Sequence, residues 1–114
     1  MATRSVIAYE DDNGNCVGVY CHYDGYPKHM YPIIDCMSYD DVKKMVETAL
    51  IQGGLRSVNN EEDYDTYEEE SKRTDWMRTS VHAHENDVDY TYFKRKDGSI
   101  FVTACDGSEI ENPY

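Results

Sequence analysis

The side chains of this chain with the most reactive chemistry are thiols and imidazoles. They occur at Cys16, Cys21, His22, His29, Cys36, His82, His84 and Cys105. A structural zinc site takes four such ligands, usually with a tight pair on one turn, but the sequence has no C-x-x-C pair. Cys21 and His22 are adjacent, so in a strand they point to opposite faces and cannot converge on a substrate. We therefore expect no metal, no cofactor and no cysteine nucleophile.

Enzyme signatures of other kinds are also missing from the sequence. It contains neither a G-x-S-x-G nucleophile turn nor a G-x-x-x-x-G-K-[ST] phosphate loop. Acidic residues are so frequent that a pair of carboxylates carries no information about general acid–base catalysis. We predict a protein that acts by binding and not by catalysis.

Acidic side chains are concentrated in one run, EEDYDTYEEE at residues 61–70. The chain has 23 Asp and Glu against 11 Lys and Arg, a formal net charge of -12 at pH 7. Such a surface repels nucleic acid and anionic membranes and attracts basic protein surfaces. The alternative is that the charge only keeps the chain soluble. The candidate partner-binding residues are Glu61, Glu62, Asp63, Tyr64, Asp65, Tyr67, Glu68, Glu69 and Glu70.

Tyrosine is unusually frequent, with 11 in 114 residues. A buried tyrosine must pair its hydroxyl, whereas at an interface it adds contact area at low entropic cost. The alternative is that tyrosines cover an open face of the sheet. Tyr64 and Tyr67 favour an interface, because we expect no core beside the acidic run.

A second candidate site is the loop expected at residues 22–32, which is rich in aromatic and polar groups. Its side chains could hold a nucleotide base between rings, and basic residues elsewhere could meet the phosphate. The candidate base-binding residues are His22, Tyr23, Asp24, Tyr26 and His29. The candidate phosphate-binding residues are Arg78, Lys94, Arg95 and Lys96. The net negative charge argues against this reading, because it repels a nucleotide.

Two hairpins are expected to form the sheet. Their strands are expected at residues 6–10, 16–21, 90–95 and 100–104. Asn13-Gly14 and Asp97-Gly98 between the strands predict two-residue type I′ turns. That turn pairs Ala8 with Val19, and the resulting core face comprises Val6, Ala8, Val17, Val19 and Cys21.

One helix is expected from Tyr39 to Gln52. Ser38 is a typical N-cap residue, and Gly53-Gly54 is typical of a helix end. Apolar residues recur with helical spacing in a single stripe. The stripe comprises Val42, Met45, Val46, Ala49 and Leu50.

These elements predict an α+β fold, an antiparallel sheet of two hairpins (about four or five strands) with one amphipathic helix on one face. We expect a single domain at residues 1–114, with an acidic loop or insert at about 59–71 and a mobile C-terminal tail. No apolar run is long enough to span a bilayer, and no signal-peptide core is recognisable. We expect reduced thiols and a location in the cytoplasm.

The segment Val19-Tyr20-Cys21-His22-Tyr23-Asp24-Gly25-Tyr26-Pro27 resembles a Y-C-H-[WY]-D-G-Y-P motif of small uncharacterised bacteriophage proteins. In those proteins a segment like residues 4–8 precedes the motif. A helix with a glycine-and-leucine turn, here at residues 53–57, and a closing aromatic hairpin, here at residues 90–103, follow it. The resemblance covers most of the chain except the acidic run. It implies a phage protein acting in the host cell, but no mechanism.

Three functional hypotheses follow. The first is a non-enzymatic anti-defence or host-takeover inhibitor, a DNA mimic whose acidic, Tyr-rich patch binds the basic groove of a host nuclease or of a CRISPR or restriction effector. The second is a sponge that sequesters a small nucleotide immune signal. The third is an accessory phage protein that acts by self-association, for example as a homodimer.

Overall fold

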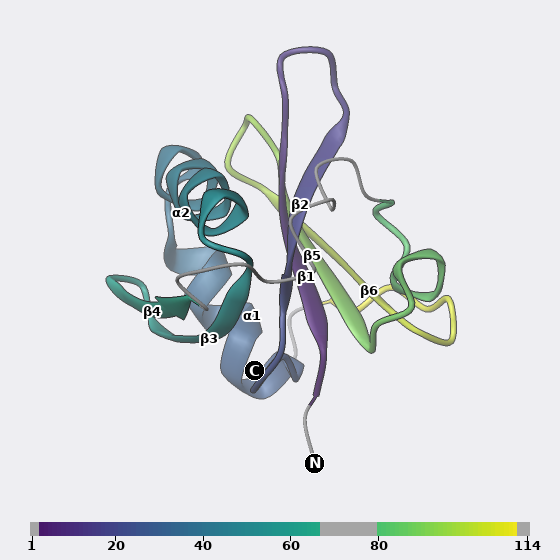
Figure 1. The fold of residues 1–114 in the computed structure, drawn as a ribbon. Coiled ribbons are helices and arrows are strands. Elements are labelled where there is room, and N and C mark those ends of the chain that lie inside the picture. The colour runs from purple at the N-terminus through teal and green to yellow at the C-terminus, as the bar shows by residue number, and fades with distance from the viewer. Residues whose placement is uncertain (1–2, 67–79, 112–114) are drawn as a thin grey trace.

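A computed structural model describes residues 3–66 and 80–111 of the chain. Its elements, in chain order, are β1 (Ser5–Glu10), β2 (Cys16–Cys21), α1 (Pro27–Cys36), α2 (Tyr39–Ile51), β3 (Leu55–Asn60), β4 (Asp63–Thr66), the 3₁₀ helix η1 (Ala83–Asn86), β5 (Tyr90–Lys94) and β6 (Ile100–Ala104). The strands form one six-stranded sheet in the order β4-β3-β2-β1-β5-β6. The hairpin of β1 and β2 lies at the centre of the sheet (Figure 1).

The sheet is mixed, so the predicted antiparallel sheet of two hairpins is wrong. β1 pairs with β5 and β2 pairs with β3 in parallel, while the outer strands β4 and β6 run antiparallel to their neighbours. Parallel strands need a crossover connection, and α1 and α2 supply the one between β2 and β3. Strands β3 and β4 were not predicted, because they are mostly polar: in β3 only Leu55 and Val58 are buried.

The predicted register of the first hairpin is wrong by one residue. Ala8 lies opposite Gly18, and Ile7 lies opposite Val19. The loop has three residues and not two, since the Asp11 N–H bonds to the Asn15 carbonyl at 2.9 Å. Only Gly14, at φ 82°, has a left-handed conformation there, as in a type I turn followed by a bulge.

The Asp11 side chain stabilises this longer loop. Its Oδ1 accepts hydrogen bonds from the backbone N–H groups of Asn13 at 2.9 Å and Asn15 at 2.8 Å. The loop of the second hairpin has the same form. There the Arg95 N–H bonds to the Ser99 carbonyl, and Phe93 consequently lies opposite Phe101, whereas the predicted two-residue loop would place it opposite Val102.

Helix α1 occupies most of the segment that was predicted to be a loop. Pro27 stands at its first position, where the missing N–H costs nothing and the fixed φ favours helix. Pro32 lies inside the helix, and together the two prolines hide the helical pattern in the sequence. The side chains of Met30, Tyr31, Ile33 and Ile34 are buried.

The prediction of α2 is confirmed. The Ser38 hydroxyl accepts a hydrogen bond from the Asp41 N–H at 3.1 Å, and the Gly54 N–H bonds to the Ala49 carbonyl at the other end. Four residues of the predicted stripe are buried, namely Val42, Met45, Val46 and Ala49. Leu50 is only partly buried, but it packs against the same core.

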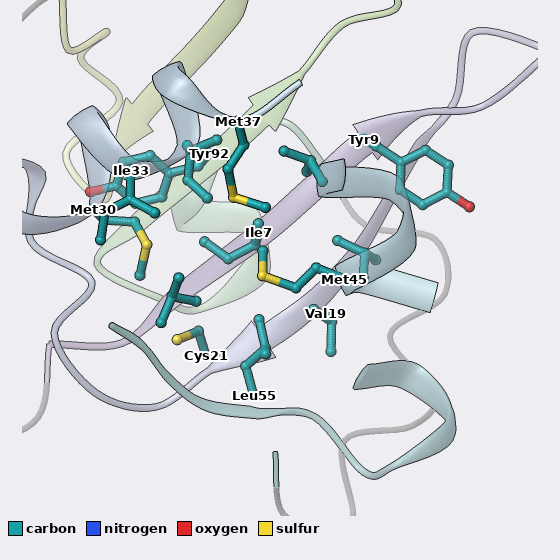
Figure 2. Packing of buried hydrophobic residues seen from close by; sticks show 14 of the residues in the cluster. Ile7, Tyr9, Val19, Cys21, Met30, Ile33, Met37, Met45, Leu55 and Tyr92 are labelled. Atoms are coloured by element: carbon teal, nitrogen blue, oxygen red, sulfur yellow. The ribbon is translucent and has the colours of Figure 1, made fainter. Parts of the chain in front are cut away.

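Both helices lie on one face of the sheet, and η1 lies on the other (Figure 1). On the helical face, Met30 and Ile33 of α1 and Met45 of α2 pack around Ile7 of β1 (Figure 2). The opposite face carries a smaller cluster of Val6, Ala8, Cys16, Tyr20, Ala83, Val88 and Phe93. The central hairpin is therefore buried on both faces, and the single core face expected for it is wrong.

Candidate functional site

The described part of the acidic run, residues 61–66, forms the turn and strand β4 of the β3–β4 hairpin at one edge of the sheet. Its carboxylates, those of Glu61, Glu62, Asp63 and Asp65, are all exposed, and we call them the acidic edge. Hydrogen bonds order the hairpin. The Asn59 amide donates to Asp63 Oδ2 at 3.2 Å, and the Glu62 N–H donates to Asn60 Oδ1 at 2.9 Å.

Tyr64 anchors this hairpin to the rest of the molecule. It lies opposite Val58 in the strand pair, is partly buried, and packs against the core that the helices cover. A second link joins the Thr66 hydroxyl to the Gln52 side chain beyond α2, at 2.8 Å. The expectation that the acidic run has no core to join is therefore wrong for Tyr64. Tyr67, Glu68, Glu69 and Glu70 lie outside the described residues.

A surface depression separates the acidic edge from the start of α2. Its volume is about 280 Å³. We call it the acid-rimmed hollow, and its lining residues are Met37, Asp41, Lys44, Met45, Glu61, Glu62 and Tyr64. Asp41 and Lys44 belong to α2, whereas Glu61 and Glu62 belong to the β3–β4 hairpin. Their proximity could not be predicted from the sequence, because β3 and β4 were not predicted.

The hollow carries an excess of negative charge. Asp41 supplies a carboxylate from the helix, Glu61 and Glu62 supply two from the hairpin, and Lys44 supplies a cation. Within the described residues the one ion pair joins Lys96 to Asp12, at 2.8 Å. Within the described segments, no lysine or arginine is therefore shown within ion-pair distance of the carboxylates of the hollow.

The second candidate site coincides with the connection from β2 to α1. Tyr23 and Tyr26 are exposed, at 43% and 44% of their surface. His22 is half-buried, and its Nδ1 shares a hydrogen bond of 2.5 Å with the Tyr20 hydroxyl. Asp24 has φ 59°, an uncommon value for a residue other than glycine. In α1, His29 Nε2 bonds to the Val58 carbonyl of β3 at 2.7 Å.

The rest of the motif at residues 19–27 serves the fold. The Gly25 N–H bonds to the Thr3 carbonyl at 3.0 Å, and its own carbonyl accepts from the Tyr92 hydroxyl at 2.5 Å. Burial raises the pKa of the Cys21 thiol to about 12, so this thiol stays protonated at neutral pH and is a poor nucleophile. The motif thus sets the course of the chain from strand to helix.

The structure does not bring Lys94, Arg95 or Lys96, the described candidate phosphate-binding residues, to these aromatic rings. Lys94 Nζ bonds to the carbonyls of Ile34 and Asp35 near the C-terminal end of α1, up to about 12 Å along the helix from its start. Arg95 lies over the Phe101 ring at 5.1 Å, and Lys96 pairs with Asp12. Arg78 lies outside the described residues. Among the described residues, the geometry therefore gives the nucleotide-sponge hypothesis no composite site.

Two further observations concern ligands and membranes. Over residues 3–66 and 80–111, no three His, Cys, Asp or Glu side chains are grouped so that they could hold a metal ion. No helix in these segments combines the length and apolar character required to cross a membrane.

Comparison of the chain with protein-family models, with curated proteins and with solved structures found no match.

Proposed function

We propose that this chain is a non-enzymatic inhibitor of phage type, which docks its acidic edge onto a basic, nucleic-acid-binding surface of a host protein. The observation that carries the proposal is the display of four exposed carboxylates on a hairpin that Tyr64 anchors to the core. An anchored hairpin presents its charges in a defined geometry, so binding costs less entropy than it would for a flexible acidic tail.

Charge explains the choice of partner. A protein surface that binds nucleic acid is rich in Lys and Arg, because it must neutralise phosphates. Asp63 and Asp65 alternate with Tyr64, so their carboxylates project from one side of β4 about 7 Å apart. Glu61 and Glu62 extend the row around the turn. Such a row of negative charges can occupy a groove that otherwise holds a phosphate backbone.

The test is competition for nucleic acid. Host proteins captured by the tagged chain are identified. The most enriched one is purified and assayed for binding to DNA or RNA. We expect the wild-type chain to displace the nucleic acid, and a Glu61→Gln/Glu62→Gln variant to associate more slowly. The on-rate of the wild type should also fall steeply as salt shortens the Debye length to about 10 Å or less.

The matched control is Glu109→Gln/Glu111→Gln, which changes the net charge equally. Glu109 bridges to Thr103 of β6, at the sheet edge opposite β4. The control should compete as well as the wild type. If both variants lose equal activity, net charge alone acts and no docking site exists. If the Glu61→Gln/Glu62→Gln variant binds the partner with the same kinetics as the wild type, the proposal is wrong.

A further inference from the structure

We propose that the acid-rimmed hollow holds the side chain of one arginine of the basic partner. This inference rests on the proposed function and specifies which group the docking surface recognises. It is carried by the hollow's position, its size and the mixture of charged and apolar groups that line it.

The position suits a docked partner. Glu61 and Glu62 belong both to the acidic edge and to the wall of the hollow. A protein bound to Glu61 and Glu62 therefore contacts the rim of the hollow. With a volume of about 280 Å³, the hollow falls just below the range of about 300–1,000 Å³ typical of small-molecule sites. It suits a single long side chain better than a free ligand.

The lining matches both parts of an arginine side chain. Met37, Met45 and Tyr64 are the apolar or aromatic residues of the lining, and Met37 and Met45 are only 5% and 2% exposed, so Tyr64 is left as the main contact for the methylene stem. Carboxylates approach from two directions, with Asp41 on the helix and Glu61 and Glu62 on the hairpin. A guanidinium has five donors in a planar fork and can bond to carboxylates on both walls.

Arginine fits this lining better than lysine. A guanidinium is more weakly hydrated than an ammonium and stacks on aromatic faces, so it gains more from the ring of Tyr64. At an exposed site this contribution corresponds to about a two- to five-fold preference in affinity. Lys44 opposes any bound cation, because it is itself positively charged, so its removal should strengthen binding.

The experiment is an amide-shift titration of the full chain by NMR at low ionic strength. The three probes are the capped peptides acetyl-Gly-Arg-Gly-amide, its lysine analogue, and its citrulline analogue, which keeps the shape of arginine without the charge. We expect the arginine peptide to shift the amides of Met37, Lys44 and Tyr64 saturably. The lysine peptide should bind about two- to five-fold more weakly, and the citrulline peptide should shift none of them.

Substitutions in the hollow should change these affinities in opposite directions. Glu62→Gln should weaken arginine binding, and Lys44→Met should strengthen it. Tyr64→Leu keeps an apolar side chain and should abolish the preference for arginine over lysine. Glu109→Gln, on the far edge of the sheet, should change nothing. If Tyr64→Leu fails to fold, the exposed positions Glu62 and Lys44 still decide the outcome.

The inference is distinguishable from the proposed function. Suppose that the arginine and lysine peptides bind with equal affinity, that Glu62→Gln weakens both equally, and that Lys44→Met changes neither affinity. The acidic edge then attracts cations, but the hollow does not recognise a particular side chain. The inference then fails and the proposed function stands. If neither peptide shifts any amide of the acidic edge, both fail. Shifts scattered over all acidic residues without saturation also overturn the inference.

Discussion

The ammonium group of Lys94 lies at the C-terminal end of α1, where its Nζ donates a hydrogen bond of 3.0 Å to the carbonyl of Ile34. A second bond of 3.1 Å reaches the carbonyl of Asp35. The last carbonyls of a helix have no partner within the helix, so a lysine of β5 satisfies two of those of α1. Its side chain is 1% exposed. Burial lowers the pKa of Lys94, and the nearby Asp35 opposes this shift.

Replacing Lys94 by methionine should destabilise the fold. The substitution preserves most of the apolar stem but leaves two buried or half-buried carbonyls without a donor, which should cost about 1–3 kcal/mol in urea unfolding. Lys96→Met, at an exposed ion pair, should leave the free energy of unfolding almost unchanged. Equal stability of Lys94→Met and the wild type would show that water satisfies these carbonyls.

Gly25→Ala should destabilise the connection between β2 and α1. A Cβ at this position would lie 2.6 Å from Ser5 Oγ, 2.7 Å from Ser5 Cβ and 2.8 Å from the Thr3 carbonyl oxygen. Contacts this close require the backbone to move, at a cost of about 1–3 kcal/mol. Thermal unfolding would measure it. Adding Ser5→Gly should recover part of the loss, because it removes two of the three contacts, and no recovery would argue against this steric account.

The apolar stripe of α2 should dominate that helix's contribution to stability. Met45 is 2% exposed, and Met45→Ala should lower the free energy of unfolding by about 2–5 kcal/mol. Ile51, at the end of the same helix, is 85% exposed, and Ile51→Ala should change stability by less than about 0.5 kcal/mol. Leu50→Ala should fall between them. Urea denaturation of the three variants checks the order, and a large loss for Ile51→Ala would indicate that a partner or second copy covers it.

Stability should fall at alkaline pH, partly through Cys21. Burial raises the pKa of this thiol from 9.0 to about 12, so above pH 9 the unfolded chain loses a proton that the folded chain keeps. The thiol's contribution is therefore complete below pH 9 and decreases above it by about 1.4 kcal/mol per pH unit. Tyr92, whose pKa burial also raises, acts in the same direction.

Cys21→Ala isolates the thiol's share of this pH dependence. The variant should be less stable than the wild type at pH 7, because it leaves a cavity. Between pH 9 and 10.5, however, its free energy of unfolding should fall less steeply with pH. Urea unfolding at several pH values compares the two slopes. Parallel curves would mean that the folded thiol ionises as readily as the unfolded one.

Local signals in the sequence determined α2 and the approximate positions of four strands. Ser38, the apolar stripe and Gly53 act within one helix, and the turns at Gly14 and Gly98 act within one hairpin, so neighbouring residues suffice to predict them. The exposure of Glu61, Glu62, Asp63 and Asp65 followed equally from their charge. The choice between a two- and a three-residue loop was less visible, because it depends on hydrogen bonds of the Asp11 side chain.

Only the tertiary structure decided which strands pair and what lies beside the acidic edge. The parallel pairing of β1 with β5 joins Ser5 to Tyr90, and no short-range pattern records a contact between residues so distant in the chain. Strands β3 and β4 have too few apolar residues to be recognised alone, and they form because Val58 and Tyr64 can pack under the helices. The acid-rimmed hollow exists for the same reason: Asp41 and Glu61 become neighbours only when the core brings α2 against the hairpin.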